Sequence, residues 1–176
     1  MIFIRDDDIF LNALWRHQVF LEYKVFVDIG IITSRPFPAK WIKKHLYMYE
    51  VCNHTHRHPK KELVNWSEKK QIEDIEKANT IIKKKIGVKP RYFIPPYGDY
   101  NKQLKETCES IGLELHPSYV MREKHEEKYY PAHEQDIIGK KDGWYVCHTG
   151  NRNPSHKRLK KNVEYLYNNK LTRFWE

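Results

Sequence analysis

The chain has 176 residues, of which 40% are hydrophobic and 14% aromatic. This length is typical of one domain with a substantial core, and this composition excludes an intrinsically disordered chain. The formal net charge is +9, because 32 lysines and arginines outnumber 23 acidic residues. Such an excess attracts anions such as nucleic acid or acidic polysaccharide, although solvated, lysine-rich helix surfaces explain it more simply.

The sequence also bears on location and redox state. No apolar run approaches about 20 residues, the length needed to cross a bilayer. Residues 1–4 are apolar but are followed at once by charged residues. We therefore expect no secretory signal peptide and a cytoplasmic or otherwise non-exported protein. The three cysteines are an odd number without Cys-x-x-Cys spacing, which favours a reducing compartment over a disulfide framework.

Apolar stretches alternate with helical patterns from the N-terminus onward. We expect strands at residues 1–5, 25–33 and 48–52, with helices at 9–22 and 39–46 between them. The buried stripe expected for the first helix consists of Leu11, Leu14, Trp15 and Val19.

A long helix is predicted between Ser67, a favourable N-cap, and Gly87, which suits the left-handed position after a helix. Its buried face is expected to carry Ile72, Ile75, Ile82 and Ile86. The remaining expected elements are strands at 92–94, 113–120 and 144–147, helices at 101–112 and 155–169, and a charged surface loop at 122–135.

This alternation predicts an α/β fold with a mostly parallel sheet or barrel, built as a single domain over residues 1–176. In such folds the C-terminal ends of the strands gather at one edge, where functional sites lie. Chemically capable residues follow three of the expected strands, at positions 5–8, 53–59 and 148.

These residues have the spacing of a metal site. His54 and His58 are four positions apart and can meet one metal ion on a single turn of chain. One carboxylate from residues 6–8 would supply a third ligand and leave a position open for water. A second carboxylate and the separate His148 would supply a base and an acid, the minimum set for metal-assisted hydrolysis.

Each pattern also has a simpler explanation. The three aspartates suit the N-terminus of the following helix, and the histidine run is compatible with a surface turn that binds metal adventitiously. His148, at the end of an apolar strand, is compatible with a structural role. Cys52 and His54 share a strand face, which would also suit a structural zinc.

Four segments together resemble the motifs of the polysaccharide deacetylases of carbohydrate esterase family 4, the NodB-homology domain. They are Arg5-Asp6-Asp7-Asp8-Ile9, His54-Thr55-His56-Arg57-His58-Pro59, Ile94-Pro95-Pro96-Tyr97-Gly98 and Val146-Cys147-His148. The family has Thr-Phe-Asp-Asp-Gly, His-Ser/Thr-x-x-His-Pro, Arg-Pro-Pro-Tyr-Gly and Leu-x-His at these places. The resemblance covers most of the chain and implies a distorted (β/α) barrel with about seven or fewer strands.

The resemblance implies a metal-dependent hydrolase that removes an acyl group, expected to be N-acetyl, from a sugar or polysaccharide. Asp8, His54 and His58 would hold one divalent transition metal, expected to be zinc, with cobalt, nickel or manganese as alternatives. O-deacetylation of a polysaccharide and deformylation of a lipid-linked sugar stay open as reactions. The resemblance does not specify an oligomeric state.

By the same resemblance, Asp7 would be the general base and His148 the general acid, and the backbone N–H of Tyr97 would help to stabilise the oxyanion. Pro96, Tyr97 and Val146 would contact substrate, since Val146 shares a strand face with His148.

Three departures from the family pattern affect these assignments. Three consecutive aspartates leave the register ambiguous, and we prefer Asp7 over Asp6 as the base because alternation places them on opposite faces. The family's third-motif arginine is replaced by Ile94, and no fourth motif is recognisable at residues 115–118. Arg5 shares a face with Asp7 and is predicted to replace the missing arginine, although a pairing of Arg5 with Asp6, or with a glutamate outside the site, is an alternative.

Two other functions remain possible at this stage. Loss of the third-motif arginine is compatible with a catalytically inactive carbohydrate-binding homologue on the same fold. The basic charge is compatible with a nucleic-acid-binding protein that carries an incidental zinc site, although no nucleic-acid-binding module is recognisable.

Overall fold

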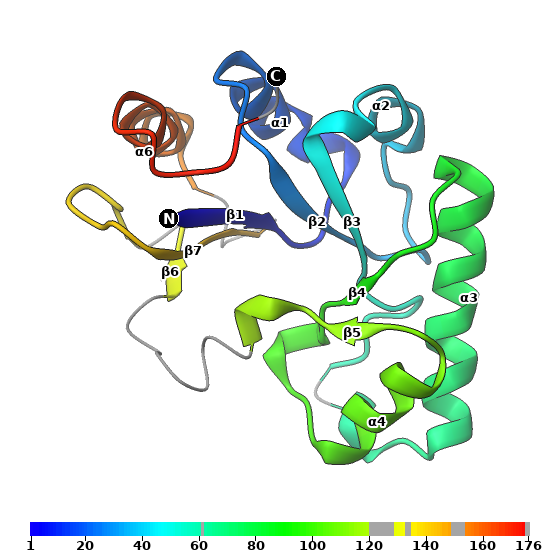
Figure 1. The fold of residues 1–176 in the computed structure, drawn as a ribbon. Coiled ribbons are helices and arrows are strands. Elements are labelled where there is room, and N and C mark those ends of the chain that lie inside the picture. The colour runs from blue at the N-terminus through cyan, green and yellow to red at the C-terminus, as the bar shows by residue number, and fades with distance from the viewer. Residues whose placement is uncertain (61, 120–128, 133–134, 149–153, 175–176) are drawn as a thin grey trace.

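The computed structural model describes residues 1–60, 62–119, 129–132, 135–148 and 154–174, and in them seven strands form one sheet (Figure 1). The strands are β1 (Ile2–Asp6), β2 (Val27–Ile31), β3 (Tyr49–Asn53), β4 (Tyr92–Phe93), β5 (Glu114–Leu115), β6 (Tyr129–Pro131) and β7 (Gly143–Cys147). Their spatial order is β5-β4-β3-β2-β1-β7-β6, and every pairing between these strands is parallel. The sheet curls into a half-barrel, which confirms the predicted α/β barrel with about seven strands.

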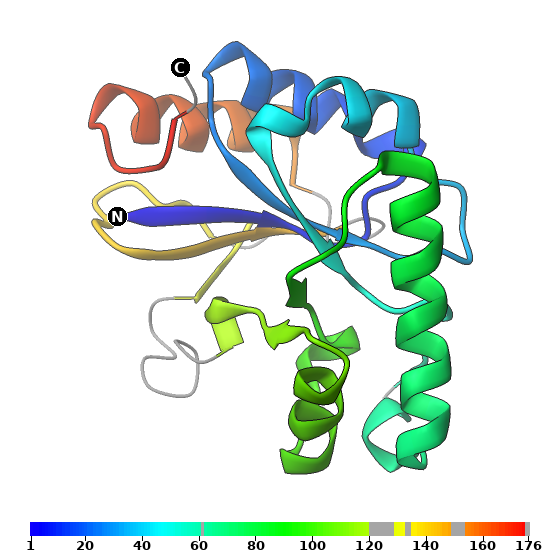
Figure 2. The ribbon, with the colours of Figure 1, turned by 45° about the vertical axis from the view of Figure 1, so that its right-hand side comes forward.

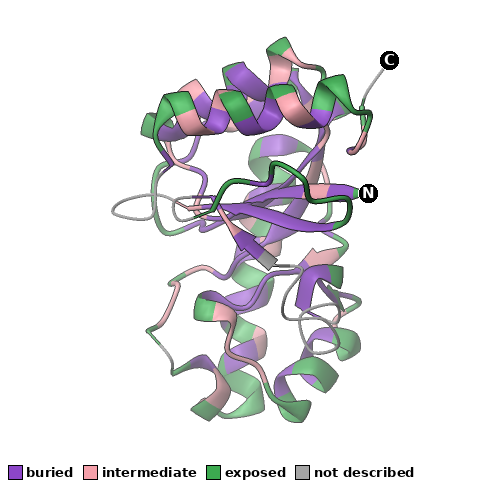
Figure 3. Ribbon diagram, turned by 90° about the vertical axis from the view of Figure 1, so that its left-hand side faces the viewer, coloured by how far each residue is buried: buried purple, intermediate pink, exposed green. Residues whose placement is uncertain are grey.

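Helices cover the outer face of this curled sheet, as Figure 2 shows. Parallel neighbours require crossover connections, and here helices provide most of them. The helices are α1 (Leu14–Glu22), α2 (Ala39–Lys44), α3 (Glu68–Ile86), α4 (Lys102–Ser110) and α6 (His156–Asn168), with short 3-10 helices η1 (Leu11–Ala13), η2 (Leu46–Met48), η3 (Leu63–Asn65) and η4 (Pro96–Gly98). Buried residues line the strands and the helix faces turned toward them (Figure 3). None of the described helices has the length and apolar character needed to cross a membrane.

The interior of the half-barrel is polar as well as apolar. Arg5 on β1 lies opposite Asp28 on β2 and opposite Val146 on β7. Residues in register on parallel strands point to the same side, so these three side chains share the concave face. Arg5, Asp28 and Val146 are at most 4% exposed. The sequence therefore places charges inside the sheet, close to the edge where the strands end.

Only part of the expected apolar stripe of the first helix is confirmed: Val19 is buried, and Leu14 and Trp15 are half-buried. Leu11 is 57% exposed, whereas α1 buries Arg16, His17, Val19 and Phe20. The reason is Asp6, which leaves β1 on the helix side and pairs with Arg16 through Nε–Oδ2 and Nη2–Oδ1 distances of 2.8 and 2.7 Å. A buried carboxylate thus determines which face of α1 turns inward.

Two other predicted boundaries need correction. The strand expected at 113–120 is limited to Glu114–Leu115, and residues 117–119 form a helical turn. Pro117 begins this turn and cannot donate a backbone hydrogen bond to a strand neighbour. The loop expected at 122–135 lies largely outside the described residues, but Tyr129–Pro131 form β6, an edge strand that was not predicted.

The helix boundaries follow the predicted caps. Helix α3 ends at Gly87 with φ +100°, and Ser67 occupies its N-cap, although the Ser67 side chain makes no capping hydrogen bond. Asn101 caps α4, since its Oδ1 accepts a hydrogen bond from the backbone N–H of Leu104 at 2.9 Å. Of the four isoleucines expected to face the core, Ile75, Ile82 and Ile86 are buried and Ile72 is half-buried.

We expect Arg16→Leu to lower the free energy of unfolding by about 3–5 kcal/mol, because it leaves the buried Asp6 carboxylate without its cation. Burial alone would raise the pKa of Asp6, but Arg16 and His17 outweigh it and hold that pKa below its ordinary value of 3.8. Stability from a carboxyl with a depressed pKa is present above its unfolded pKa and is lost as pH falls below about 4. Urea unfolding of wild type and variant at pH 7 and pH 3 should therefore show a smaller difference at the lower pH. An equal difference at both pH values would contradict this account.

Candidate metal and catalytic site

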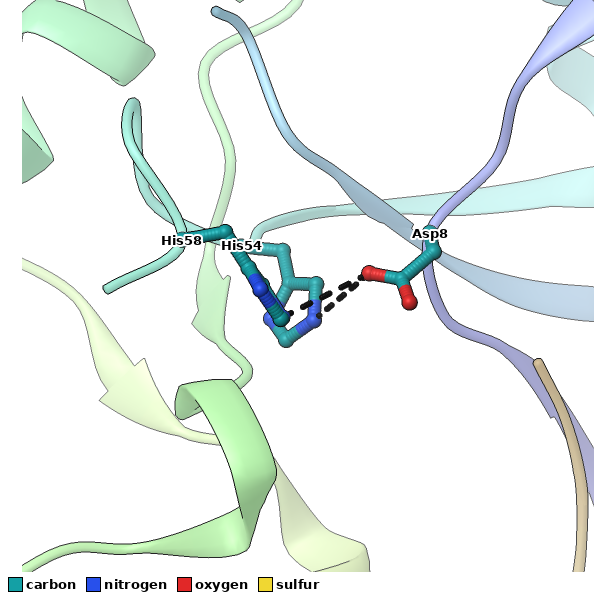
Figure 4. Close-up of side chains that lie close together, drawn as sticks. All are labelled: Asp8, His54 and His58. Carbon is teal, nitrogen blue, oxygen red and sulfur yellow. Dashed lines mark ion pairs between the residues drawn. The ribbon is translucent and has the colours of Figure 1, made fainter. Parts of the chain in front are cut away.

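Three predicted metal ligands converge at the C-terminal edge of the sheet (Figure 4). Asp8 follows β1, and His54 and His58 follow β3. Asp8 Oδ1 lies 3.3 Å from His54 Nε2 and 3.5 Å from His58 Nε2. All three ligand atoms lie within 4.8 Å of one another, and no other group of this kind occurs in the described part of the chain.

The donor set fits a divalent transition metal. Ligand atoms about 2.0–2.2 Å from a tetrahedral ion are separated by roughly 3.4 Å, close to the distances seen between Asp8 and the two histidines. His54 Nδ1 lies 2.7 Å from the carbonyl oxygen of Ile94, so Nδ1 carries the proton and Nε2 presents its lone pair to the site. Such a hydrogen bond behind a metal-binding histidine fixes both its tautomer and its ring orientation.

The electrostatics of the three ligands reflect their mutual contact. Burial would raise the pKa of Asp8, but the hydrogen bond and charge of His54 outweigh it and lower that pKa. Burial would lower the pKa of His54, but Asp8 outweighs it and raises that pKa. Burial and the neighbouring His54 lower the pKa of His58 to about 4. His58 is therefore a neutral donor over a wide pH range, the form a metal requires.

The backbone of this edge is strained. Asp8, Thr55, His58 and Tyr97 have φ angles of 61°, 69°, 53° and 59°, in the left-handed region that favours glycine. Such conformations persist only where surrounding contacts hold them, and they cluster at functional sites. Here Thr55 Oγ1 accepts a hydrogen bond from the His58 N–H at 2.9 Å, and Asn53 Oδ1 accepts one from the Thr55 N–H at 2.7 Å.

Asp7 lies beside the metal-ligand group but points into the half-barrel. Its Oδ2 accepts a hydrogen bond from Arg5 Nη2 at 2.8 Å, and His148 Nε2 lies 3.9 Å from the same oxygen. Asp7 Oδ1 is buried and has no hydrogen-bond partner among the described residues. Asp6 points to the opposite side, as strand alternation predicts. The alternative pairing of Arg5 with Asp6 is thus not what the structure shows, since Asp6 pairs with Arg16.

The other predicted site residues surround this pair. His148 is partly exposed after β7, and its carbonyl oxygen accepts a hydrogen bond from Arg16 Nη1 at 3.2 Å. Burial lowers the pKa of His148, with Arg5 acting in the same direction against the attraction of Asp7. Val146 is fully buried on the same strand face as Arg5.

The Pro96–Tyr97 turn lies on the other side of the ligand group. Pro96 is buried, whereas Tyr97 is 45% exposed. The ring centroid of Tyr97 lies 5.0 Å from that of His58. An exposed aromatic ring beside His58 suits contact with a sugar, and the substrate contacts expected for this turn stay a prediction.

Sequence reasoning missed the residues that hold Arg5. Ser118 Oγ accepts a hydrogen bond from Arg5 Nη1, and the Tyr119 ring centroid lies 4.8 Å from the centre of the Arg5 guanidinium. His116 and Asp28 lie behind Ser118 in the same network. The only sequence signal for this contact with Arg5 was the pair of polar residues His116 and Ser118, two positions apart and directly after the strand that contains Leu115.

The alternative zinc site with Cys52 lacks support. Cys52 packs in an apolar cluster with Ile75 and Phe93, away from the group formed by His54 and its two partner ligands. Burial raises the pKa of the Cys52 thiol well above its ordinary value, which disfavours the thiolate that zinc binds. Cys147 is a buried core thiol, as expected.

Comparison with known proteins supports the resemblance in fold and family. Residues 34–116 match the family model described as polysaccharide deacetylase. The whole chain also superposes on solved deacetylases. The peptidoglycan deacetylase PdaC from Bacillus subtilis covers 96% of this chain and is covered over 84% of its own, with a TM-score of 0.67 and 18% identity. Residues 34–116 thus resemble polysaccharide deacetylases in sequence, and the chain has their NodB-type fold.

Other proteins similar to this chain carry different descriptions. The bifunctional xylanase/xylan deacetylase of Cellvibrio japonicus is 27% identical over 77 residues, which are 44% of this chain and 11% of that protein. The uncharacterized protein YlxY of Bacillus subtilis (strain 168) is 32% identical over 92 residues, 52% of this chain and 27% of that protein. A structure described as a family 4 pseudoenzyme, BA3943 from Bacillus anthracis, aligns with 98% of this chain and 62% of its own at a TM-score of 0.67 and 14% identity. The chain thus spans well under a third of the two curated relatives that it matches.

We expect His58→Ala to lose most of its bound metal, because it removes one of three protein ligands. His56→Ala is the matched control from the same run, since His56 Nδ1 lies 2.9 Å from Thr33 Oγ1 and His56 is not part of the ligand group. It should keep the wild-type content. The measurement is the metal-to-protein ratio by mass spectrometry after loading with zinc or cobalt and dialysis. Full occupancy in His58→Ala would remove this residue from the site.

Proposed function

We propose that this domain is a metal-dependent hydrolase that removes acetyl groups from a sugar or polysaccharide. The observation that carries the proposal is the Asp7 carboxylate. It is ion-paired to Arg5, and its other oxygen is buried beside the ligand group with no hydrogen-bond partner among the described residues. A buried, unpaired carboxylate oxygen is destabilising unless something binds it. A water molecule that gives up its proton to Asp7 would satisfy this oxygen.

Asp8, His54 and His58 would hold one divalent transition metal, expected to be zinc, with cobalt, nickel or manganese as alternatives. Such an ion would act as a Lewis acid toward water and toward the acyl carbonyl. Asp7 would take the proton from the attacking water through Oδ1, while Arg5 compensates the carboxylate charge through Oδ2.

His148 would deliver the proton that the leaving amine or alcohol needs. His148 Nε2 lies 3.9 Å from Asp7 Oδ2, the oxygen that also accepts the hydrogen bond from Arg5. The proposed acid therefore lies next to the proposed base. The lowered pKa of His148, due first to burial, makes it a stronger acid toward a leaving group.

The acyl group and the sugar would lie next to the proposed acid and base. Val146 would contact the acyl methyl and Pro96 would form part of the wall, while the exposed ring of Tyr97 would pack against the sugar. The backbone N–H of Tyr97 would donate to the oxyanion, a role to which its left-handed conformation contributes by orienting that peptide.

The names of two relatives support a substrate class. One is named a xylan deacetylase and another a peptidoglycan deacetylase, so both O-acetyl and N-acetyl groups are candidates. We place N-acetylated glycans first, because a histidine acid is needed most where the leaving group is an amine. Xylan-type O-acetyl esters come second.

The alternative function is a catalytically inactive homologue that binds glycans. Ile94 favours it, because the position of the family arginine is apolar, and so does the likeness to a pseudoenzyme structure. Against it stands Arg5, which supplies a guanidinium to Asp7 from a different strand.

The proposed function predicts that the metal-loaded domain releases acetate from an acetylated chito-oligosaccharide or acetylated xylan, and that a chelator abolishes this. Asp7→Asn should retain metal and lose at least about 100-fold in kcat, the usual scale of general-base catalysis. The control is Asp6→Asn, whose carboxylate lies on the other strand face. It should destabilise the fold but keep kcat within a few-fold. The inactive-homologue function would instead give glycan binding without acetate release, and a loss in Asp6→Asn alone would mean that the register is off by one.

We expect Arg5→Leu to lower kcat while metal stays bound, because Asp7 loses its only described cationic hydrogen-bond donor. Ile94→Arg added to Arg5→Leu should restore part of this loss. Ile94 Cδ1 lies 3.3 Å from where a Cβ on Gly30 would be, so the side chain already points into the concave interior, and the absence of a Cβ at Gly30 leaves room. Steady-state kinetics on the two variants measure the recovery. An unchanged kcat in Arg5→Leu would contradict the idea that Arg5 takes the role of the family's third-motif arginine.

A further inference from the structure

A line of hydrogen-bonded side chains runs through the interior of the curled sheet to the proposed base. It begins at Asp28 on β2, whose Oδ1 accepts a hydrogen bond from Arg173 Nη2 at 2.6 Å. Asp28 Oδ2 lies 3.2 Å from His116 Nε2, and His116 Nδ1 lies 2.8 Å from Ser118 Oγ. Ser118 Oγ accepts a hydrogen bond from Arg5 Nη1. The line therefore ends on the arginine that pairs with the proposed base.

The partners fix the direction of each hydrogen bond in this line. Asp28 is an acceptor, so His116 donates from Nε2, and its Nδ1 is left to accept the hydroxyl proton of Ser118. Ser118 then presents its oxygen lone pairs to Arg5. Burial lowers the pKa of His116, and the charge of Arg5 acts in the same direction against the hydrogen bond to Asp28, so the imidazole is neutral. His116 must be neutral for this set of hydrogen bonds, because its Nδ1 has to be unprotonated to accept the hydroxyl proton of Ser118.

The guanidinium of Arg5 is held on three sides. One end donates to Asp7, the other end donates to Ser118, and the ring of Tyr119 lies against its face. Tyr119 also donates from its hydroxyl to the Pro95 carbonyl oxygen at 3.4 Å, just before the turn that carries the proposed oxyanion donor. An arginine side chain has several rotatable bonds. A guanidinium group that is held at both ends and on one face has lost its rotational freedom before substrate binds.

We propose that His116 and Ser118, anchored by Asp28, are positioning residues that orient Arg5 so that its Nη2 is presented to Asp7. This inference rests on the proposed function, because these residues act only through Arg5 and Asp7. It assigns a role to the segment after β5, which matches no motif of the family. It also explains how Arg5, on β1, can pair with the proposed base, a role that the family gives to an arginine in the loop after β4.

A nucleophilic role for the same residues does not fit their placement. Serine, histidine and aspartate in this order form the triads of acyl-transfer enzymes. Ser118 is 1% exposed and His116 and Asp28 are at most 4% exposed, so no substrate reaches the hydroxyl. The Ser118 oxygen is also engaged by a cation, which lowers its nucleophilicity. The network is therefore arranged to hold Arg5.

The test begins with Ser118→Ala, which removes the acceptor for Arg5 and changes little volume. We expect kcat to fall about tenfold, the scale of one hydrogen bond to a charged group, with KM and metal content unchanged. Asp28→Asn should act in the same direction. The matched control is Thr107→Val, which removes a buried hydroxyl bonded to Gln71 Oε1 at 3.0 Å between α3 and α4 and should leave kcat unchanged.

A double-mutant cycle separates positioning from a general loss of stability. In an Arg5→Leu background, Ser118→Ala should cause no further fall in kcat, because the residue through which it acts is gone. Should Arg5→Leu not fold, Arg5→Lys provides the background, since lysine keeps the charge without the two-ended fork. Losses that multiply in the double variant, or a Thr107→Val loss as large as that of Ser118→Ala, would overturn the proposal.

A readout without turnover distinguishes this inference from the proposed function. The shifts in the thermal unfolding midpoint caused by Ser118→Ala and Arg5→Leu should be strongly non-additive in the full chain, whether or not any glycan is deacetylated. Absence of acetate release together with this coupling would reject the proposed function and leave the network intact. Additive midpoint shifts would show that Ser118 and Arg5 are not coupled and would reject the positioning role itself.

Discussion

The whole site depends on how three adjacent aspartates at the end of β1 are separated. Like charges on neighbouring residues repel one another, and burying them together is very unfavourable. Strand alternation sends Asp6 to the helix side and Asp7 into the half-barrel, and a left-handed φ of 61° turns Asp8 toward the histidines. Each carboxylate therefore has its own compensating partner: Arg16, Arg5 and the histidine pair. The fold tolerates these charges because no two of them share an environment.

The cations that compensate these charges also connect distant parts of the chain. Arg16 on α1 bonds both Asp6 and the carbonyl oxygen of His148, so it joins the first helix to the end of β7. Arg5 joins β1 to the turn after β5. Buried ion pairs contribute little net stability compared with apolar packing, but removal of one partner is strongly destabilising. Such pairs define a single arrangement of the interior, which is what a pre-organised site needs.

At the C-terminal edge of the sheet, loops with a strained backbone follow strands that are rigid and buried. Four residues with left-handed backbone, Asp8, Thr55, His58 and Tyr97, surround the ligand group. Behind them stand strands that are almost completely buried on both faces. A rigid sheet can hold a strained loop in a conformation that the loop alone would leave, and the side chains then point at one another without further rearrangement. The side-chain oxygens of Asn53, Asp74 and Thr55 support this strained loop by accepting hydrogen bonds from the backbone N–H groups of Thr55, His56 and His58.

The sequence by itself determined the alternation of strands and helices, the parallel sheet and the closeness of His54 and His58, because these depend on local period and on spacing within one turn. The choice of Asp8 as their neighbour came from the resemblance to the family motifs, and the structure groups it with the two histidines. The same period-two rule placed Arg5 and Asp7 on one face. Only the tertiary structure decided the partners that come from far along the chain. The inward face of α1 followed from Asp6 rather than from its leucines, and Ser118, 113 residues after Arg5, became its neighbour only when β5 and the turn after it were placed in the half-barrel. Local sequence patterns carry information about strand faces, helix faces and turns. Long-range contacts between buried charges depend on how the sheet curls, and no short stretch of sequence specifies this curl.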